Sequence, residues 1–181
     1  MTASERTDAR YCRRIEAAAI GGLILSPRRL DEVRPWLKQD DFAVAHYGRW
    51  YGYICELHDR AQPIDQVTLL TELRRHDDLG PDGRYAFELA TITERVPIPG
   101  EPAYYARAVI EESTRRQLRI AGLRMARVAQ HADVADVLAD AIAVNESVER
   151  LRRRWNASTP KLFPTESGAR GEASSASFDL S

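Results

Sequence analysis

Apolar residues recur at helical spacing through most of this chain, from residue 13 to residue 155, and no segment alternates as a strand does. The pattern predicts an all-α fold, in which a small orthogonal helical bundle is followed by a long-helix hairpin. A short helix is expected after Ser26 and Pro27, which suit the N-cap and the first position of a helix. The other helices are expected at about 13–25, 45–60, 65–76, 84–95, 102–131 and 134–155.

Residues 13–101 contain enough large apolar residues to form the core of a globular bundle. Gly21 and Gly22 weaken the first helix by about 1 kcal/mol each relative to alanine, so we expect another helix to approach them closely. Asp65 is the expected cap of the helix that follows Pro63. The densest apolar stripe lies in 45–60 and consists of Tyr47, Trp50, Tyr51, Ile54, Leu57 and His58.

Residues 102–155 are expected to form the hairpin, with its turn at Ala132 and Asp133 and with Asp133 as a helix cap. The second helix carries a regular apolar seam with steps of three and four residues. Because two helices cannot fully bury such a seam against each other, we expect this hairpin to mediate dimerisation or partner binding. The seam consists of Val137, Ala141, Val144, Val148, Leu151 and Trp155.

The two ends of the chain carry weaker patterns. Residues 1–12 are polar and are expected to be a flexible N-terminus. Residues 156–181 are rich in serine, glycine and proline, which predicts a disordered tail.

Composition narrows the class of function. The chain has 181 residues with 26 basic and 27 acidic side chains, a balance that argues against a nucleic-acid coat or a polybasic membrane binder. No apolar run approaches the ~18 residues of a membrane span, and no secretory signal is visible. Cys12 and Cys55 lie far apart, which predicts a cytoplasmic protein without a disulfide framework.

No catalytic or metal motif is evident, so we expect no enzyme activity, no cofactor and no metal. Lys38 and Lys161 are the only lysines, and neither stands in the Gly-Lys-Ser/Thr sequence of a Walker A motif. Cys55 and His58 share a helical turn but lack further ligands. The pairs Asp40-Asp41 and Asp77-Asp78 are interpreted as helix caps and solvated charges.

The expected helix 102–131 carries six arginines and only two acidic residues. Three interpretations remain open for these arginines. They can form solvated faces, contact an acidic protein partner, or bind nucleic acid directly, which would make the chain an all-α DNA-binding regulator that uses residues 107–127. Their distribution around the helix, without stacking aromatics, makes nucleic acid the least favoured of the three. The candidate contacts are Arg115, Arg116, Arg119, Arg124 and Arg127.

Several segments resemble, in order, the N-terminal domain of the DnaB-type replicative helicases. Glu16 to Leu25, followed by Asp41-Phe42, is similar to that family's Glu-x-x-Val-Leu-Gly-x-Leu-Leu-Leu opening and its Asp-Phe turn. The stretch Pro63-Ile-Asp-Gln-Val-Thr-Leu69 is similar to the family's Pro-Ile-Asp-x-Val-Thr-Leu segment and is the most specific match. Tyr104 to Glu112 resembles its Tyr-Tyr-Ala-x-Ile-Val-x-Glu element. The loop at 82–87 departs from the family pattern.

This resemblance implies the helicase collar domain without the RecA-like motor. In that family hairpins pair, the paired domains form a ring, and the ring binds the helicase-binding domain of the primase. The resemblance therefore implies a non-catalytic protein of DNA replication that forms a dimer or a hexameric ring. Its expected partners are primase or a full-length helicase, with no membrane contact. A truncated helicase remnant is the other alternative.

Overall fold

The computed structural model describes residues 3–159, with side chains described from residue 9 onward. These residues contain helices and loops but no strand, which confirms the all-α prediction. No helix among them combines the length and apolar character that crossing a bilayer requires. The α-helices are α1 (Ala3–Leu25), α2 (Leu30–Val33), α3 (Ala45–Asp59), α4 (Gln66–Arg75), α5 (Arg84–Thr91), α6 (Pro102–His131) and α7 (Val134–Ala157). Short 3-10 helices are η1 (Pro27–Arg29), η2 (Gln39–Asp41), η3 (Pro81–Gly83) and η4 (Ile92–Arg95).

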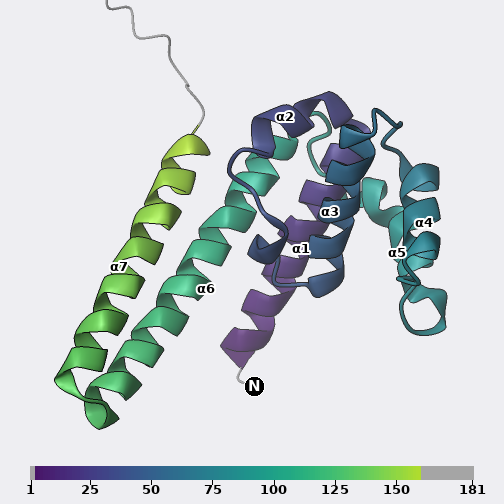
Figure 1. The fold of residues 1–181 in the computed structure, drawn as a ribbon. Helices are drawn as coiled ribbons and strands as arrows, with labels where there is room; N and C mark the ends of the chain where they lie inside the picture. The colour runs from purple at the N-terminus through teal and green to yellow at the C-terminus, as the bar shows by residue number, and fades with distance from the viewer. Residues whose placement is uncertain (1–2, 160–181) are drawn as a thin grey trace, which may run out of the picture.

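Helices α1 to α5 form the bundle, and α6 and α7 extend from it as an antiparallel hairpin (Figure 1). The first part of α6 belongs to the bundle, because its apolar face packs against α1. Tyr105, Ala106, Val109 and Ile110 of α6 are buried in the same core as Ile20 and Leu23 of α1. The boundary expected between residues 101 and 102 therefore passes through one packed core, and the projecting part of the hairpin begins after Ser113, which is also buried.

Several helix ends differ from the expected ones. Helix α1 begins at Ala3, so residues 3–12 continue the helix that was expected to start at residue 13. The segment after Ser26 divides into η1 and α2 and ends at Val33, and the side chain of Ser26 makes no capping hydrogen bond. The expected disordered tail also begins too early, because α7 continues to Ala157. The rest of that tail, from residue 160, lies outside the described residues.

The close approach predicted at Gly21 and Gly22 is confirmed. A Cβ atom at Gly21 would lie 2.7 Å from the backbone oxygen of Ile92, and one at Gly22 would lie 3.2 Å from Pro102 Cβ. The approaching segments are η4 and the start of α6. Glycine therefore lets the bundle close over α1 at the point where the chain turns into the hairpin.

The capping prediction at Asp65 is also confirmed. Its Oδ1 accepts hydrogen bonds from the backbone N–H groups of Val67 and Thr68, both at 2.8 Å. Thr68 Oγ1 in turn accepts one from the N–H of Asp65 at 3.0 Å, which completes a reciprocal cap. Asp133 stands at the N-cap of α7 as expected, but its side chain makes no capping bond.

One residue of the aromatic stripe of α3, Tyr47, contacts a buried carboxylate on α5. Tyr47, Trp50, Tyr51, Ile54 and Leu57 are buried as expected, whereas His58 lies at the edge with a third of its side chain exposed. The hydroxyl of Tyr47 donates to Glu88 Oε1 at 2.5 Å. The guanidinium of Arg13 donates to both Glu88 oxygens, at 2.8 and 3.0 Å. Glu88 thus joins α1, α3 and α5.

Burial and hydrogen bonding have opposite effects on Glu88. Burial alone would raise the pKa of its carboxyl, but the bonds from Tyr47 and Arg13 outweigh burial and hold the pKa below the ordinary value of a glutamate. His46 Nε2 lies 3.2 Å from Glu88 Oε2. Burial lowers the pKa of His46 although Glu88 is close, which favours the neutral form of this histidine.

We expect the substitution Glu88→Gln to lower the free energy of unfolding by about 1–3 kcal/mol at pH 7, because it removes the charged acceptor of the buried Tyr47 hydroxyl and of the partly exposed Arg13 guanidinium. The folded-state pKa of Glu88 is depressed relative to the unfolded chain, so its contribution to stability is complete above the unfolded-state pKa and is lost as the pH falls through the folded-state pKa. The variant should therefore lose less additional stability than wild type between about pH 5 and pH 3. Thermal unfolding followed by circular dichroism measures both effects. Exposed Glu94→Gln is the control, and parallel pH curves for wild type and Glu88→Gln would contradict the assignment.

Candidate protein-interaction surface

The seam of α7 faces α6 of the same chain. Leu151 is buried, and Val137, Ala141, Val144, Val148 and Trp155 are half-buried. The half-buried residues Ala121, Met125 and Val128 of α6 share the facing side by helical spacing. The seam therefore packs mainly against α6 of the same chain. The sequence pattern alone could not distinguish this role from that of a surface left free for a partner.

Part of the seam remains accessible in a groove between the two helices. This groove has a volume of about 280 Å³ and is lined by Ile120, Ala121 and Arg124 of α6. Val144, Val148 and Leu151 of the seam form much of its other wall. The expectation of an exposed seam thus holds only for the mouth of this groove.

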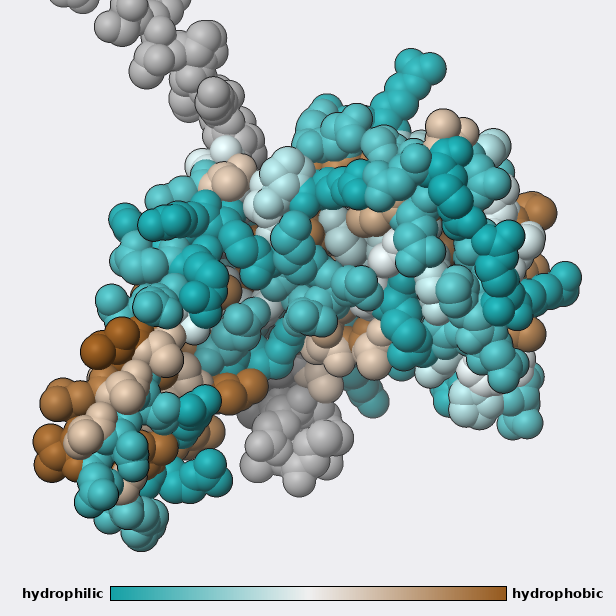
Figure 2. Space-filling view, in the orientation of Figure 1, coloured by the Kyte–Doolittle hydropathy of each residue, from teal (hydrophilic) through white to brown (hydrophobic). Residues whose placement is uncertain are grey.

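Six large apolar side chains lie exposed around the projecting half of the hairpin, and we call them the outer patch. Figure 2 shows a hydrophobic area at the end of the molecule that carries the projecting half of α6 and α7. Val134, Leu138 and Ile142 recur every four residues along α7 and are 75%, 59% and 63% exposed. Exposed apolar clusters of this kind mark association surfaces in soluble proteins. The outer patch consists of Leu118, Ile120, Leu123, Val134, Leu138 and Ile142.

The outer patch was not predicted from the sequence, although α7 carries a signal for it. The apolar residues of α7 cover two adjacent stripes, one at the seam and one at Val134, Leu138 and Ile142. A face this wide contains more apolar residues than one antiparallel neighbour can cover. The width of the apolar face, rather than the regularity of the seam, was therefore the informative feature.

Buried Asp41 fixes the base of the hairpin to the bundle. Its carboxylate accepts hydrogen bonds from Ser113 Oγ at 2.8 Å and from the backbone N–H of Lys38 at 2.7 Å, and it forms an ion pair with Arg154 of α7. Arg154 Nε also donates to the backbone oxygen of Trp36 at 2.9 Å. Asp41 was expected to be a cap and a solvated charge; the cap is present, but the charge is fully buried.

Most of the candidate contact arginines are already engaged within the chain. Arg115 pairs with Glu111 at 2.6 Å, and Arg124 pairs with Asp140 at 2.5 Å. Arg116 donates to the backbone oxygen of Asp41 at 2.9 Å. Within residues 9–159, Arg119 and Arg127 form no ion pair. Such engagement weakens the DNA-binding alternative, which needs a continuous set of free cations.

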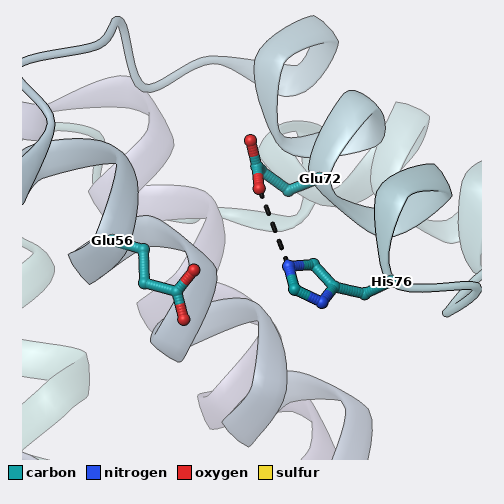
Figure 3. Close-up of side chains that lie close together, drawn as sticks. All are labelled: Glu56, Glu72 and His76. Carbon is teal, nitrogen blue, oxygen red and sulfur yellow. Dashed lines mark ion pairs between the residues drawn. The ribbon is translucent and has the colours of Figure 1, made fainter.

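The arrangement of Cys55 and His58, which share a helical turn in the sequence, does not favour a metal ion. Burial raises the pKa of the Cys55 thiol, and His58 Nε2 lies 3.4 Å from Asp31 Oδ1. Glu56, Glu72 and His76 do lie close together on α3 and at the end of α4 (Figure 3). However, Glu72 Oε1 is 3.1 Å from the guanidinium of Arg60 and 3.4 Å from that of Arg75. These cations already neutralise the only buried ligand of the group, so the arrangement does not favour a metal ion.

The described residues form an all-α bundle that presents a hairpin with exposed apolar residues, an architecture typical of domains that associate with other proteins. Residues 9–111 match the model of the DnaB-like helicase N terminal domain, and the chain belongs to this family. The resemblance seen in the sequence is therefore confirmed.

Known relatives agree with this assignment. The chain is 33% identical over 145 residues to the replicative DNA helicase DnaB of Mycobacterium leprae, covering 78% of this chain and 24% of that helicase. It is 30% identical to the replicative DNA helicase DnaC of Bacillus subtilis, covering 79% of this chain and 31% of the relative. The chain thus spans about a quarter to a third of the length of these relatives.

Two solved structures show the same fold. The N-terminal domain of DnaB helicase from Mycobacterium tuberculosis superposes with a TM-score of 0.67 at 30% identity, over 75% of this chain and 95% of that one. The corresponding domain from Helicobacter pylori, described with its interactions with primase, superposes with a TM-score of 0.59 at 20% identity. That match covers 72% of this chain and all of the other.

We expect Asp41→Asn to lower the free energy of unfolding by about 3 kcal/mol, because it leaves Arg154 without its charged partner in a buried site. The matched control is Asp59→Asn, which removes an exposed carboxylate bound by Arg34 at 2.5 Å. An exposed pair contributes little, so the control should unfold close to wild type. Urea titration followed by tryptophan fluorescence compares the variants. Equal stabilities for both would show that Asp41 does not anchor the hairpin.

Proposed function

We propose that this chain is a non-catalytic interaction module of bacterial DNA replication that acts in the cytoplasm. It self-associates through its hairpin as a dimer or a hexameric ring, and it contacts primase or a full-length replicative helicase. The observation that carries the proposal is the outer patch, which lies on the hairpin of a domain of the DnaB-like helicase N-terminal family.

Self-association is supported by the different exposure of the two apolar stripes of α7. The seam is largely used by α6 of the same chain, while Val134, Leu138 and Ile142 remain exposed. Exposing such side chains to water costs about 25 cal/mol for each Å² of apolar surface, and a second hairpin can remove this cost by covering them. Because identical surfaces meet in a two-fold dimer, one patch is sufficient for pairing.

Contact with the replication machinery is supported by family membership and by the relative from Helicobacter pylori, which was described with its interactions with primase. Arg119 and Arg127 are the free cations proposed to contact an acidic surface of such a partner, because the other candidate arginines are engaged within the chain. The matched relatives are helicases, but the match covers only their N-terminal family domain, so the proposed role is binding rather than unwinding.

We expect the double substitution Leu138→Glu and Ile142→Glu to abolish self-association, because two carboxylates would have to be buried at the contact. Both side chains are exposed, so the monomer should unfold at nearly the temperature of wild type. Sedimentation velocity over a range of concentrations measures the assembly state. Val67→Glu, at a 74% exposed apolar residue of α4, is the matched control and should associate like wild type. A wild-type chain that sediments as a monomer at every concentration would contradict the proposal.

We expect the purified chain to bind either the primase or the full-length replicative helicase of its own organism. Sedimentation of binary mixtures should show a complex with one of them, and unwinding by the helicase should change when the chain is added. The chain alone should not hydrolyse ATP. Mixtures that sediment as separate components in both cases would contradict the proposed partners.

A further inference from the structure

A second groove lies at the base of the hairpin, where the end of α7 meets the start of α6, and we call it the basal groove. Its volume is about 710 Å³, and residues of α1 and α2 contribute to its wall. Two aromatic side chains in this wall, Tyr11 and Tyr104, are 56% and 67% exposed, so the groove offers apolar surface for binding. The apolar part of its lining consists of Tyr11, Trp36, Ala103, Tyr104, Ala108 and Ala157.

The last described residues of the chain lead into this groove. Ser158 and Thr159 line it, and Arg107 Nη2 donates to Thr159 Oγ1 at 3.5 Å. Because α7 runs antiparallel to α6, a chain that continues in the direction of α7 passes from Arg107 toward the N-terminal end of α6 (Figure 1). Tyr104 lies in that direction, one helical turn or about 5 Å along the axis from Arg107. The residues that follow Thr159 therefore reach the exposed ring of Tyr104 without a reversal of direction.

The sequence after Thr159 suits an apolar groove. Leu162 and Phe163 are adjacent large apolar residues, and only two residues separate them from Thr159. An extended chain spans about 3.3–3.6 Å per residue, so Phe163 reaches up to about 13 Å from Thr159. Pro164 follows the pair and biases Phe163 toward an extended backbone. A segment with this bias loses less conformational entropy when it binds in an extended form.

Charge favours the same segment. Glu32 and Glu101 both line the basal groove, and the guanidinium of Arg29 lies between them, 2.9 Å from Glu32 Oε1 and 3.1 Å from Glu101 Oε2. One cation thus serves two carboxylates, which leaves an excess of negative charge at this point. Lys161 is the only basic residue of 160–164 and stands directly before the apolar pair. Its ammonium group complements this excess.

The tether to α7 favours this segment over a separate partner. A segment joined to its binding site by a short linker is present there at an effective concentration on the order of millimolar. Even a weak contact therefore keeps the groove occupied, whereas a separate protein has to displace the tethered segment before it binds.

We infer that residues 161–163 dock in the basal groove of the same chain, with the apolar pair against Tyr104 and with Lys161 beside Glu101. The docked segment would fasten the end of α7 to the bundle and close this groove to other proteins. The inference concerns the base of the hairpin and does not depend on the proposed self-association, because the outer patch lies at 118–142 in the projecting half.

Cleavage by a lysine-specific protease tests this inference, because the bond after Lys161 lies within the docked segment. In the full chain this bond should be cut about tenfold or more slowly than in a synthetic peptide of residues 156–168, since the protease cuts only the undocked fraction. The other lysine, Lys38, lies in the bundle, where its backbone N–H donates to Asp41 at 2.7 Å. Products of cleavage at Lys38 therefore report unfolding of the bundle. Mass spectrometry over time gives both rates.

Variants of the groove test where the segment docks without changing the residues around the cleaved bond. Tyr104→Ala removes exposed apolar surface, and Ala108→Arg fills the groove with a charge that repels Lys161. Each should raise the rate of cleavage after Lys161 about fivefold or more. Phe87→Ala, at a 74% exposed aromatic residue of α5, is the matched control and should be cut like wild type.

Each contrary outcome overturns a different part of the inference. Cleavage of the full chain as fast as the peptide would show that the segment does not dock. Protection that persists in both groove variants would show that the segment docks elsewhere and leaves the basal groove to a separate partner. Protection that rises with the concentration of the chain would show docking on a second copy instead of the same chain. The double substitution of Leu138 and Ile142 tests the outer patch separately from all of these.

Discussion

The position of the hairpin depends on one buried carboxylate. Asp41 ends the short helix η2 between α2 and α3, yet it connects that segment to Ser113 of α6 and to Arg154 of α7. These contacts bring together residues separated by more than seventy positions in sequence. Because an unpaired buried charge is costly, α7 is held at its far end and cannot swing freely from the turn. The cation of Arg107 over the ring of Trp155, 4.7 Å from its centroid, strengthens the same end.

With its base fixed, the hairpin projects from the bundle, and no other segment of residues 3–159 covers its outer half (Figure 1). Within the bundle, close contacts at the glycines, the aromatic stripe of α3 and the hydrogen bonds of Glu88 join the helices to one another. The projecting half retains exposed apolar residues, a basic helix and an acidic helix. This contrast places the stability of the chain mainly in the bundle and its capacity for association mainly in the hairpin.

Much of the fold could be predicted because it depends on local patterns. Six of the seven α-helices follow from apolar spacing, Asp65 caps α4 through its own side chain, and Gly21 and Gly22 indicated a close approach. Predictions failed where a residue's role depended on a distant segment. Asp41 looked like a solvated loop charge, and the first half of α6 looked like part of a separate hairpin.

The sequence by itself determined the helical class, the family and the presence of a hairpin with more apolar residues than its own two helices can cover. Periodicity and motifs are properties of neighbouring residues, so they can be recognised without coordinates. Only the tertiary structure decided which apolar stripe of α7 is buried against α6 and which remains exposed. That choice depends on how α7 is rotated against α6, and the rotation is set by long-range contacts such as that between Asp41 and Arg154.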